Sequence, residues 1–131
     1  MIDTNVWLSG LIFGGNPGGL IKSFSEGTII VAISEELISE LRRKITEKFP
    51  LYLSQLQLLE ASLRQDAEMV RLGSKTVSAS RDVDDNKFIE TALLSNCDFI
   101  ISGDRHLLEL KQYEGIKIVK PAALLKLIKD S

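Results

Sequence analysis

The part of the sequence that decides the fold class places a strand, an acid and a helix in direct succession. Residues 98–110 read DFIISGDRHLLEL. The apolar run Phe99–Ile101, within a strand expected over Asp98–Ser102, is typical of strands that are buried on both faces. Asp104 follows after two small residues, and Arg105–Leu110 has the apolar spacing of a short helix. The stretch therefore predicts a buried strand whose carboxyl end is followed by an acid and a helix.

The same alternation extends in both directions from this stretch. Apolar runs predict strands at Met1–Asp3, Thr28–Ile33, Asp98–Ser102 and Ile116–Val119. Caps, breakers and helical spacing predict helices over Gly19–Glu26, from the N-cap Ser34 to before Pro50, over Ser54–Leu72, from Asp84 or Asp85 to about Ser95, over Arg105–Leu110, and from Pro121 to Ile128. A short extended piece is expected at Thr76–Ala79, and the glycine-rich residues 14–19 are interpreted as a flexible loop. The pattern predicts a single domain over residues 1–131 with an α/β fold, a three-layer α/β/α sandwich around a mostly parallel central sheet.

The composition is that of a globular chain. Of its 131 residues, 44% are apolar and 26% are charged, and no apolar run approaches the roughly 20 residues needed to cross a bilayer. The N-terminus has no basic patch followed by an apolar stretch, so no signal peptide is expected. Cys97 is the single cysteine, which excludes an internal disulfide and paired-cysteine zinc spacing. These features predict a cytoplasmic protein with no membrane partner.

The net charge of −2 argues against a broad basic surface for nucleic acid. The basic residues nevertheless crowd two segments. These are Arg42, Arg43, Lys44 and Lys48 in the first, and Lys117, Lys120, Lys126 and Lys129 in the second. Both segments can be solvated helix faces. Alternatively, Arg42 and Arg43, which are close to Glu40 in sequence, guide a phosphate backbone.

Four carboxylates fall near the place where an open α/β sheet binds its ligands, beyond the carboxyl ends of the strands. Asp3 follows the first strand, and Asp104 follows the strand at 98–102. Asp85 stands at the start of a helix, and Glu40 borders the apolar face of the helix that begins after Ser34. We expect these side chains to point into one crevice.

Carboxylates that converge on one crevice repel one another unless a cation lies between them. Mg²⁺ and Mn²⁺ favour carboxylate oxygens and retain several waters. Such a metal lowers the pKa of a bound water and stabilises the leaving oxygen of a phosphodiester. The sequence shows no pairing of His with Ser or Cys that would indicate nucleophilic catalysis by the protein. The acids therefore favour a metal-dependent phosphodiester hydrolase.

Each acid also has a simpler interpretation. Asp3 and Asp104 suit ordinary turns at strand ends. Glu40 is spaced for an i,i+4 ion pair with Lys44. Three acids compete to cap the helix that starts near residue 84: Asp82, Asp84 and Asp85. The residues alone leave both interpretations open.

Four motifs, taken in order, resemble the PIN domain, the PilT N-terminus family of nucleases. They are Asp3-Thr4-Asn5-Val6, Glu40 in Glu-Leu-Arg-Arg, Arg81-Asp82-Val83-Asp84-Asp85-Asn86, and Ile101-Ser102-Gly103-Asp104. The resemblance covers essentially the whole chain. Within the family, the chain is most similar to the toxin components of toxin–antitoxin pairs.

The resemblance implies that Mg²⁺ or Mn²⁺ is held by an acidic quartet of Asp3, Glu40, Asp85 and Asp104. Asp85 is preferred because it stands seven residues before a small helix residue, Ala92. The further polar residues implied are Asp82 and Asp84 as outer ligands, and Asn5 and Ser102 as neighbours that hydrogen-bond the acids or their waters. The activity implied is that of a metal-dependent endoribonuclease acting on RNA and leaving a 5′-phosphate. The partners implied are a second copy in a homodimer and an antitoxin protein that blocks the crevice.

Two positions depart from the family pattern. Only two residues precede Asp3 in this sequence, so either the first strand is truncated or the true start lies upstream, and His106 stands where many relatives carry a further acid. We interpret His106 as an exposed helix residue. Trp7 is expected to pack in the core or at a dimer face rather than to stack on a base.

Three other classes of protein share part of this pattern. A receiver-type signalling domain needs paired acids after the first strand, and Asp3 has no adjacent acid. A phosphatase of the haloacid dehalogenase type needs an acid at position 5, where this chain has Asn5. A catalytically silent PIN-fold module that binds RNA or a protein stays open as the main alternative.

Overall fold

The computed structural model describes the backbone of residues 1–71 and 83–130, and the side chains of residues 1–71 and 89–130. The helices are α1 (Thr4–Ile12), α2 (Gly15–Ser25), α3 (Glu35–Lys48), the 3-10 turn η1 (Pro50–Tyr52), α4 (Leu53–Asp66), α5 (Val83–Ser95), α6 (Arg105–Leu110) and α7 (Pro121–Asp130). The strands are β1 (Ala32–Ser34), β2 (Glu68–Val70), β3 (Phe99–Ile101), β4 (Gln112–Tyr113) and β5 (Ile116–Val119). The extended piece expected at 76–79 lies outside the described residues.

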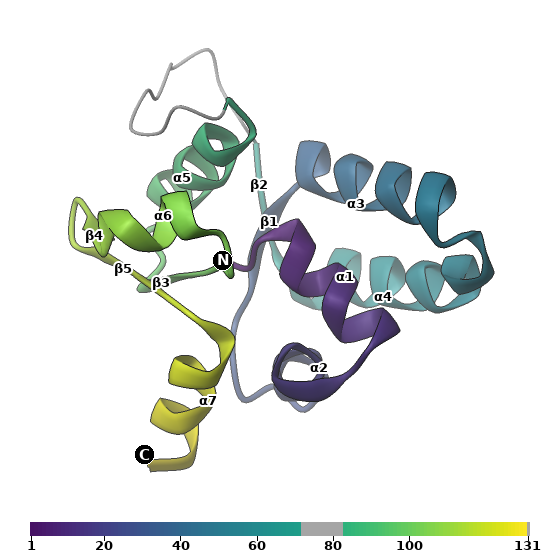
Figure 1. Ribbon diagram of the computed structural model, residues 1–131, viewed down its shortest axis with the longest axis horizontal. Helices are drawn as coiled ribbons and strands as arrows, with labels where there is room; N and C mark the ends of the chain where they lie inside the picture. The colour runs from purple at the N-terminus through teal and green to yellow at the C-terminus, as the bar shows by residue number, and fades with distance from the viewer. Residues whose placement is uncertain (72–82, 131) are drawn as a thin grey trace.

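The strands are short and mostly parallel. β1 pairs with β2 and β3 pairs with β5 in parallel, whereas β4 runs antiparallel to β5. Ile2 forms an isolated parallel bridge with Ile101, which places the first residues of the chain beside β3. Helices α1, α3 and α4 lie on one side of the strands and α5 and α6 lie on the other (Figure 1). The predicted α/β fold is confirmed, with its strands in two small, mostly parallel sheets of order β1-β2 and β3-β5-β4.

Helix α3 shows how directly the sequence specifies its own boundaries. The Ser34 hydroxyl accepts a hydrogen bond from the Leu37 backbone N–H at 3.3 Å, and Glu35 and Glu36 occupy the first turn. The cap satisfies a backbone donor that a helix start leaves free, and the acids suit the positive end of the helix dipole. The predicted N-cap at Ser34 is therefore confirmed.

The core gathers the apolar faces of these helices around the strands. Trp7 is 1% exposed and meets Phe24 edge-to-face, with ring centroids 6.1 Å apart. Core packing of Trp7 was one of the expected roles and is confirmed. Gly10 lets α1 and α2 approach closely, because a Cβ at this position would lie 3.0 Å from the backbone of Pro17. This contact fixes the start of α2 against α1.

Helix α4 ends earlier than its apolar spacing predicts. The predicted helix Ser54–Leu72 stops at Asp66, and Glu68–Val70 forms β2 instead. Ala67 takes an extended conformation, with φ −80° and ψ 156°, and β2 then pairs with β1. A contact between distant segments overrides the local helical pattern here, which no short sequence window reveals.

The interpretation of the glycine-rich residues 14–19 as a flexible loop is wrong. Helix α2 begins at Gly15, so most of this stretch is its first turn. Gly14 and Gly15 have φ of 73° and 63°, which glycine adopts without strain. Pro17 fits because the first-turn N–H groups have no partner within the helix.

The remaining strands differ from prediction by smaller amounts. β1 starts at Ala32, later than the predicted Thr28, and extends to Ser34, while β3, β5 and α6 lie where they were expected. The short strand β4 was not predicted. Among the helices of the described ranges, none has both the length and the apolar character that a membrane crossing requires.

Candidate active site

Asp3 lies at the point where the chain leaves the sheet and enters α1. Its backbone N–H donates to the carbonyl of Ile101 at 2.9 Å, so the position is fixed by the neighbouring strand. Its side chain caps α1, with Oδ1 accepting from the Asn5 backbone N–H at 3.1 Å. The residue is only 3% exposed. Asp3 is therefore a buried carboxylate with a fixed orientation, as well as a cap.

Ser102 joins Asp3 to Asp104. The Ser102 hydroxyl donates to Asp3 Oδ2 at 2.8 Å and accepts from the Asp104 backbone N–H at 2.9 Å. Ser102 is fully buried, so this geometry is protected from competing water. Asp104 in turn caps α6, with Oδ1 accepting from the His106 backbone N–H at 2.7 Å. Two strand ends that are adjacent through the bridge of Ile2 thus place two acids around one hydroxyl.

Opposing effects act on the pKa of the Asp3 carboxyl. Burial raises the pKa of the Asp3 carboxyl, and the negative charge of Asp104 raises it as well. Hydrogen bonds from Ser102 and Asn5 and the positive charge of Lys44 act in the opposite direction. Since desolvation is the largest of these effects, the ionised form of Asp3 is disfavoured. A cation bound beside Asp3 and Asp104 would reverse that balance.

Glu40 reaches the same region through Lys44. The Lys44 ammonium lies 3.2 Å from Glu40 Oε1 and donates to Asn5 Oδ1 at 3.0 Å and to Thr4 Oγ1 at 3.3 Å. Both charged side chains are mostly buried, with 19% of Lys44 and 12% of Glu40 exposed. The i,i+4 pair expected as the simpler interpretation of Glu40 is confirmed. The pair does not lie on open surface, however, because it packs against the first turn of α1 beside Asp3.

The two arginines near Glu40 are engaged elsewhere. Arg42 forms an ion pair with Glu60 on α4, and Arg43 pairs with Glu47 at 3.5 Å on the exposed surface of α3. Both arrangements fit the solvated helix face better than a role in guiding phosphate. His106 is exposed, as expected, and its backbone rather than its ring contacts Asp104.

The acids around residue 84 complete the list of sequence-predicted candidates. Asp82 lies outside the described residues, and Asp84 and Asp85 belong to the first turn of α5, where side chains lie outside the description. Among the side chains that are described, no three acids, histidines or cysteines gather closely enough to hold a metal. The described part of the site therefore consists of the linked pair Asp3 and Asp104, with Glu40 held nearby by Lys44.

This donor set fits a hard divalent cation in chemical kind. Its potential ligands are carboxylate oxygens, which Mg²⁺ and Mn²⁺ prefer, and these ions need only one or two carboxylates together with water. Asp3 is the best-suited ligand because its burial makes an unneutralised charge costly. Asp104 can bind the same ion, since Ser102 holds both residues together. Glu40 can join through its carboxylate or through a water.

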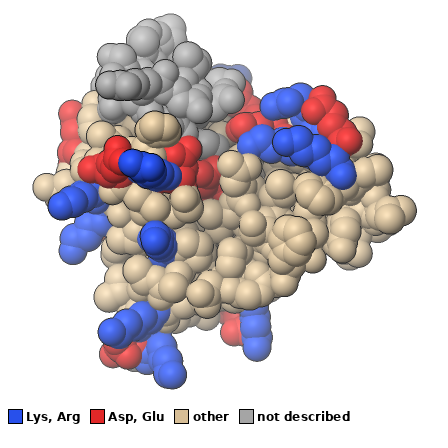
Figure 2. Space-filling view, in the orientation of Figure 1, with Lys and Arg blue, Asp and Glu red and all other residues tan. Residues whose placement is uncertain are grey.

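Charge on the surrounding surface is mixed. Figure 2 shows Lys and Arg side chains in separate groups across this face, interleaved with acids rather than merged into one basic patch. The surface agrees with the net charge of −2. Any anionic polymer would therefore be held at particular points rather than by a broad positive field.

The fold and the linked acids define a class of α/β proteins with an acidic site at the carboxyl ends of parallel strands. A family model described as PIN domain matches residues 1–106, and the chain belongs to the PIN domain family. PIN domains are generally nucleases, so the class of activity is that of a nuclease. No curated protein and no solved structure shows significant similarity to the chain.

Lys44 is the residue of this site whose place the sequence did not reveal. Its spacing from Glu40 predicts the ion pair, but nothing in the sequence indicates that the pair contacts Thr4 and Asn5 some forty residues earlier. The available signal was the apolar face of α3, with Leu37 and Leu41 buried. Side chains beside that face pack against whatever covers it, which here is α1.

Proposed function

We propose that this PIN domain is a metal-dependent endoribonuclease that hydrolyses RNA phosphodiester bonds with Mg²⁺ or Mn²⁺. The observation that carries the proposal is the pair Asp3 and Asp104, joined through the buried Ser102 hydroxyl at the ends of adjacent parallel strands. The raised pKa of Asp3 supports it, because a bound cation would favour the ionised form that burial disfavours.

The roles of the side chains follow from their positions. Asp3 and Asp104 hold the metal, and Ser102 links the Asp3 carboxylate to the backbone of Asp104. Asp85 is proposed as a third ligand from the resemblance to the family. When bound, the metal activates a water for attack and stabilises the leaving oxygen. Glu40 binds the metal or orients the attacking water, and Lys44 holds Glu40 and Asn5 in place.

The direct experiment is cleavage of a mixed, end-labelled RNA pool by purified protein with Mn²⁺ or Mg²⁺, beside the same reaction in EDTA. The Asp104→Asn variant should lose cleavage. Asp98→Asn is the matched control, because Asp98 is an exposed acid at the opposite end of the same strand. Cleavage that persists in EDTA or in Asp104→Asn would refute the proposal.

A biological role as the toxin of a toxin–antitoxin pair is proposed from the resemblance of the motifs. It includes a homodimer and an antitoxin partner that covers the site. The test is growth arrest on induced expression, which Asp104→Asn should relieve and Asp98→Asn should not. Arrest that is equal for both variants would exclude RNA cleavage as its cause.

A catalytically silent PIN module that binds RNA or a protein is the second candidate. The observation in its favour is that Glu40 is already neutralised by Lys44 at 3.2 Å. The cleavage assay separates the two, since a silent module would bind RNA while neither variant changed the RNA pool.

A further inference from the structure

The ammonium of Lys44 lies among oxygen atoms that come from two helices. Its Nζ is 3.2 Å from Glu40 Oε1 on α3, and 3.0 Å from Asn5 Oδ1 and 3.3 Å from Thr4 Oγ1 on α1. An ammonium has three N–H donors and no acceptor, so each donor has one oxygen. The side chain is also mostly buried. Lys44 is therefore held in one place and has no donor left for a substrate phosphate.

These three oxygens, which we call the oxygen cradle, are of the kinds that hard metal ions bind. They belong to a carboxylate, a side-chain amide and a hydroxyl, and carboxylate and carbonyl oxygens suit Mg²⁺ and Mn²⁺. Their distances of 3.0–3.3 Å from Nζ suit an ammonium, whereas Mg²⁺ binds oxygen at about 2.1 Å. The lysine thus fills a position that a metal ion would occupy if the ammonium were removed and the oxygens moved inward.

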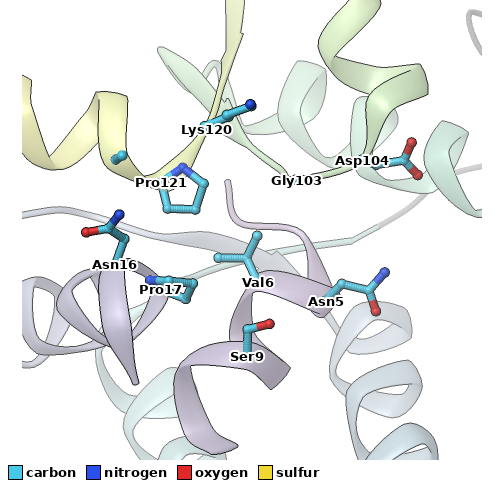
Figure 3. Close-up of a pocket in the computed structure, with 10 residues that line it drawn as sticks. Asn5, Val6, Ser9, Asn16, Pro17, Gly103, Asp104, Lys120 and Pro121 are labelled. Carbon is cyan, nitrogen blue, oxygen red and sulfur yellow. The ribbon is translucent and has the colours of Figure 1, made fainter. Parts of the chain in front are cut away.

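Asn5 connects the oxygen cradle to the acidic pair. Its backbone N–H donates to Asp3 Oδ1 at 3.1 Å, while its side-chain oxygen accepts from Lys44. In Figure 3, Asn5 and Asp104 lie on the same side of the pocket that both residues line. Burial raises the pKa of the Asp3 carboxyl, and the positive charge of Lys44 acts against that rise. The ammonium is therefore a fixed positive charge next to the proposed metal site.

We propose that Lys44 takes the place of a second divalent cation, so that this chain binds one metal ion, at Asp3 and Asp104, and not two. Two-metal sites clamp the attacking and leaving oxygens of a phosphodiester between cations about 3.5–4 Å apart. Here the ammonium supplies the second positive charge, and it is part of the chain. This inference rests on the proposed function for the first ion, and it adds the number of ions and the residue that replaces the other.

The contact with Lys44 also favours one of the two roles proposed for Glu40. Glu40 Oε1 faces the ammonium, and no side chain within the described residues donates a hydrogen bond to Oε2. Glu40 keeps 12% of its side chain exposed, so water can reach it. A carboxylate that already faces one cation gains less from a second, but its remaining oxygen can accept a hydrogen bond from water. Glu40 thus orients the attacking water, and Lys44 is a positioning residue.

The number of bound Mn²⁺ ions tests the proposal without measuring cleavage. Free Mn²⁺ is followed by EPR while the full chain is titrated, and the parent should bind one ion. Lys44→Ala, which empties the oxygen cradle, should bind a second ion about tenfold more weakly, because the cradle has one carboxylate and the first site has two. Lys44→Arg, which keeps a cation there, should bind one.

Lys22→Ala is the matched control, because Lys22 also forms an i,i+4 pair, with Glu26 at 3.9 Å, but on the exposed surface of α2. This variant should bind one ion, like the parent. Two ions on the parent, or one ion on Lys44→Ala, would overturn the inference and leave the metal site at Asp3 and Asp104 intact. No bound ion on the parent would refute the proposed function and the inference with it.

The second test probes the oxygen cradle with a small organic cation, in EDTA. Methylammonium has three N–H donors, as the lysine head group does, whereas tetramethylammonium has none. Methylammonium should raise the urea midpoint of Lys44→Ala saturably, because it binds the folded variant. Tetramethylammonium should not raise it, and Lys22→Ala should respond to neither ion. Equal responses to the two ions, or equal responses of the two variants, would overturn the assignment of this position as a cation site.

Discussion

Replacing Ser102 with alanine tests the link between the two acids. The Ser102 hydroxyl is the donor for Asp3 Oδ2 at 2.8 Å and the acceptor for the Asp104 backbone N–H at 2.9 Å. Alanine leaves a buried carboxylate with one donor fewer. A hydrogen bond to a charged group contributes about 1.5–3 kcal/mol, and the unpaired N–H adds to the loss. We therefore expect Ser102→Ala to lower the free energy of unfolding by about 2–4 kcal/mol at neutral pH.

The pH dependence follows from the raised pKa of Asp3. The folded protein binds this proton more tightly than the unfolded chain does, so stability is greatest below the ordinary aspartate pKa and falls as pH rises through the folded pKa. Ser102→Ala removes a hydrogen bond that lowers this pKa. In the variant, the stability should therefore go on falling up to a higher pH than in the parent. The difference between Ser102→Ala and the parent should thus grow as pH rises and shrink when Asp3 is protonated.

Urea unfolding across this pH range measures both effects. Ser95→Ala is the matched control, because its hydroxyl donates to the neutral carbonyl of Ala92 at 3.0 Å; it should cost about 1 kcal/mol at every pH. A double-mutant cycle with Asp3→Asn isolates the coupling. If Ser102→Ala costs the same in the Asp3→Asn background and shows no pH dependence, the proposed role of the link is wrong.

Three further outcomes are expected. Asp3→Asn should lower RNA cleavage more than about 100-fold because it removes a metal ligand. Its loss of stability in urea should be small, because removal of a disfavoured buried charge offsets the loss of the hydrogen bond from Ser102. A variant that cleaves like the parent would contradict the site. Lys44→Met should cost about 1.5–3 kcal/mol in urea unfolding, because it leaves the mostly buried Glu40 carboxylate without its charged partner. It should also lower cleavage about ten- to hundredfold, because Glu40 loses its anchor. Lys44→Arg, which keeps the charge, should recover part of both, and full activity of the methionine variant would remove Lys44 from the site. His106→Ala should leave cleavage unchanged, since His106 contacts Asp104 through its backbone N–H. A large loss of cleavage would indicate that the imidazole ring contacts the phosphate.

Much of the fold could be predicted because its signals are local. The Ser34 cap, the helix at Arg105–Leu110 and the strand Ile116–Val119 are each specified by neighbouring residues. The end of α4 and strand β2 could not be predicted in the same way, because Glu68–Val70 becomes a strand only through its pairing with β1. The glycines of residues 14–19 predict a flexible loop in the sequence, whereas in the structure Gly14 and Gly15 supply the positive φ at the start of α2.

In the candidate site too, some features could be predicted from the sequence and others depend on tertiary packing. Adjacent strand ends brought Asp3 and Asp104 together, as parallel topology predicts, and Ser102 hydrogen-bonds Asp3, as was expected of a polar neighbour. The network of Lys44 depends on how α3 packs against α1, which is a tertiary contact with no local signature. The catalytic roles of Glu40 and Asp85 stay predictions.

The most direct test of the central claim, that Asp3 and Asp104 share a divalent cation, is a Mn²⁺ titration followed by paramagnetic broadening of amide NMR signals. We expect saturable broadening of the Asn5 and Gly103 amides that weakens with distance toward Lys117 at the far end of β5, and loss of this effect in Asp104→Asn but not in Asp98→Asn. Broadening that never saturates, or that is the same in Asp104→Asn, would show that these carboxylates serve the fold alone.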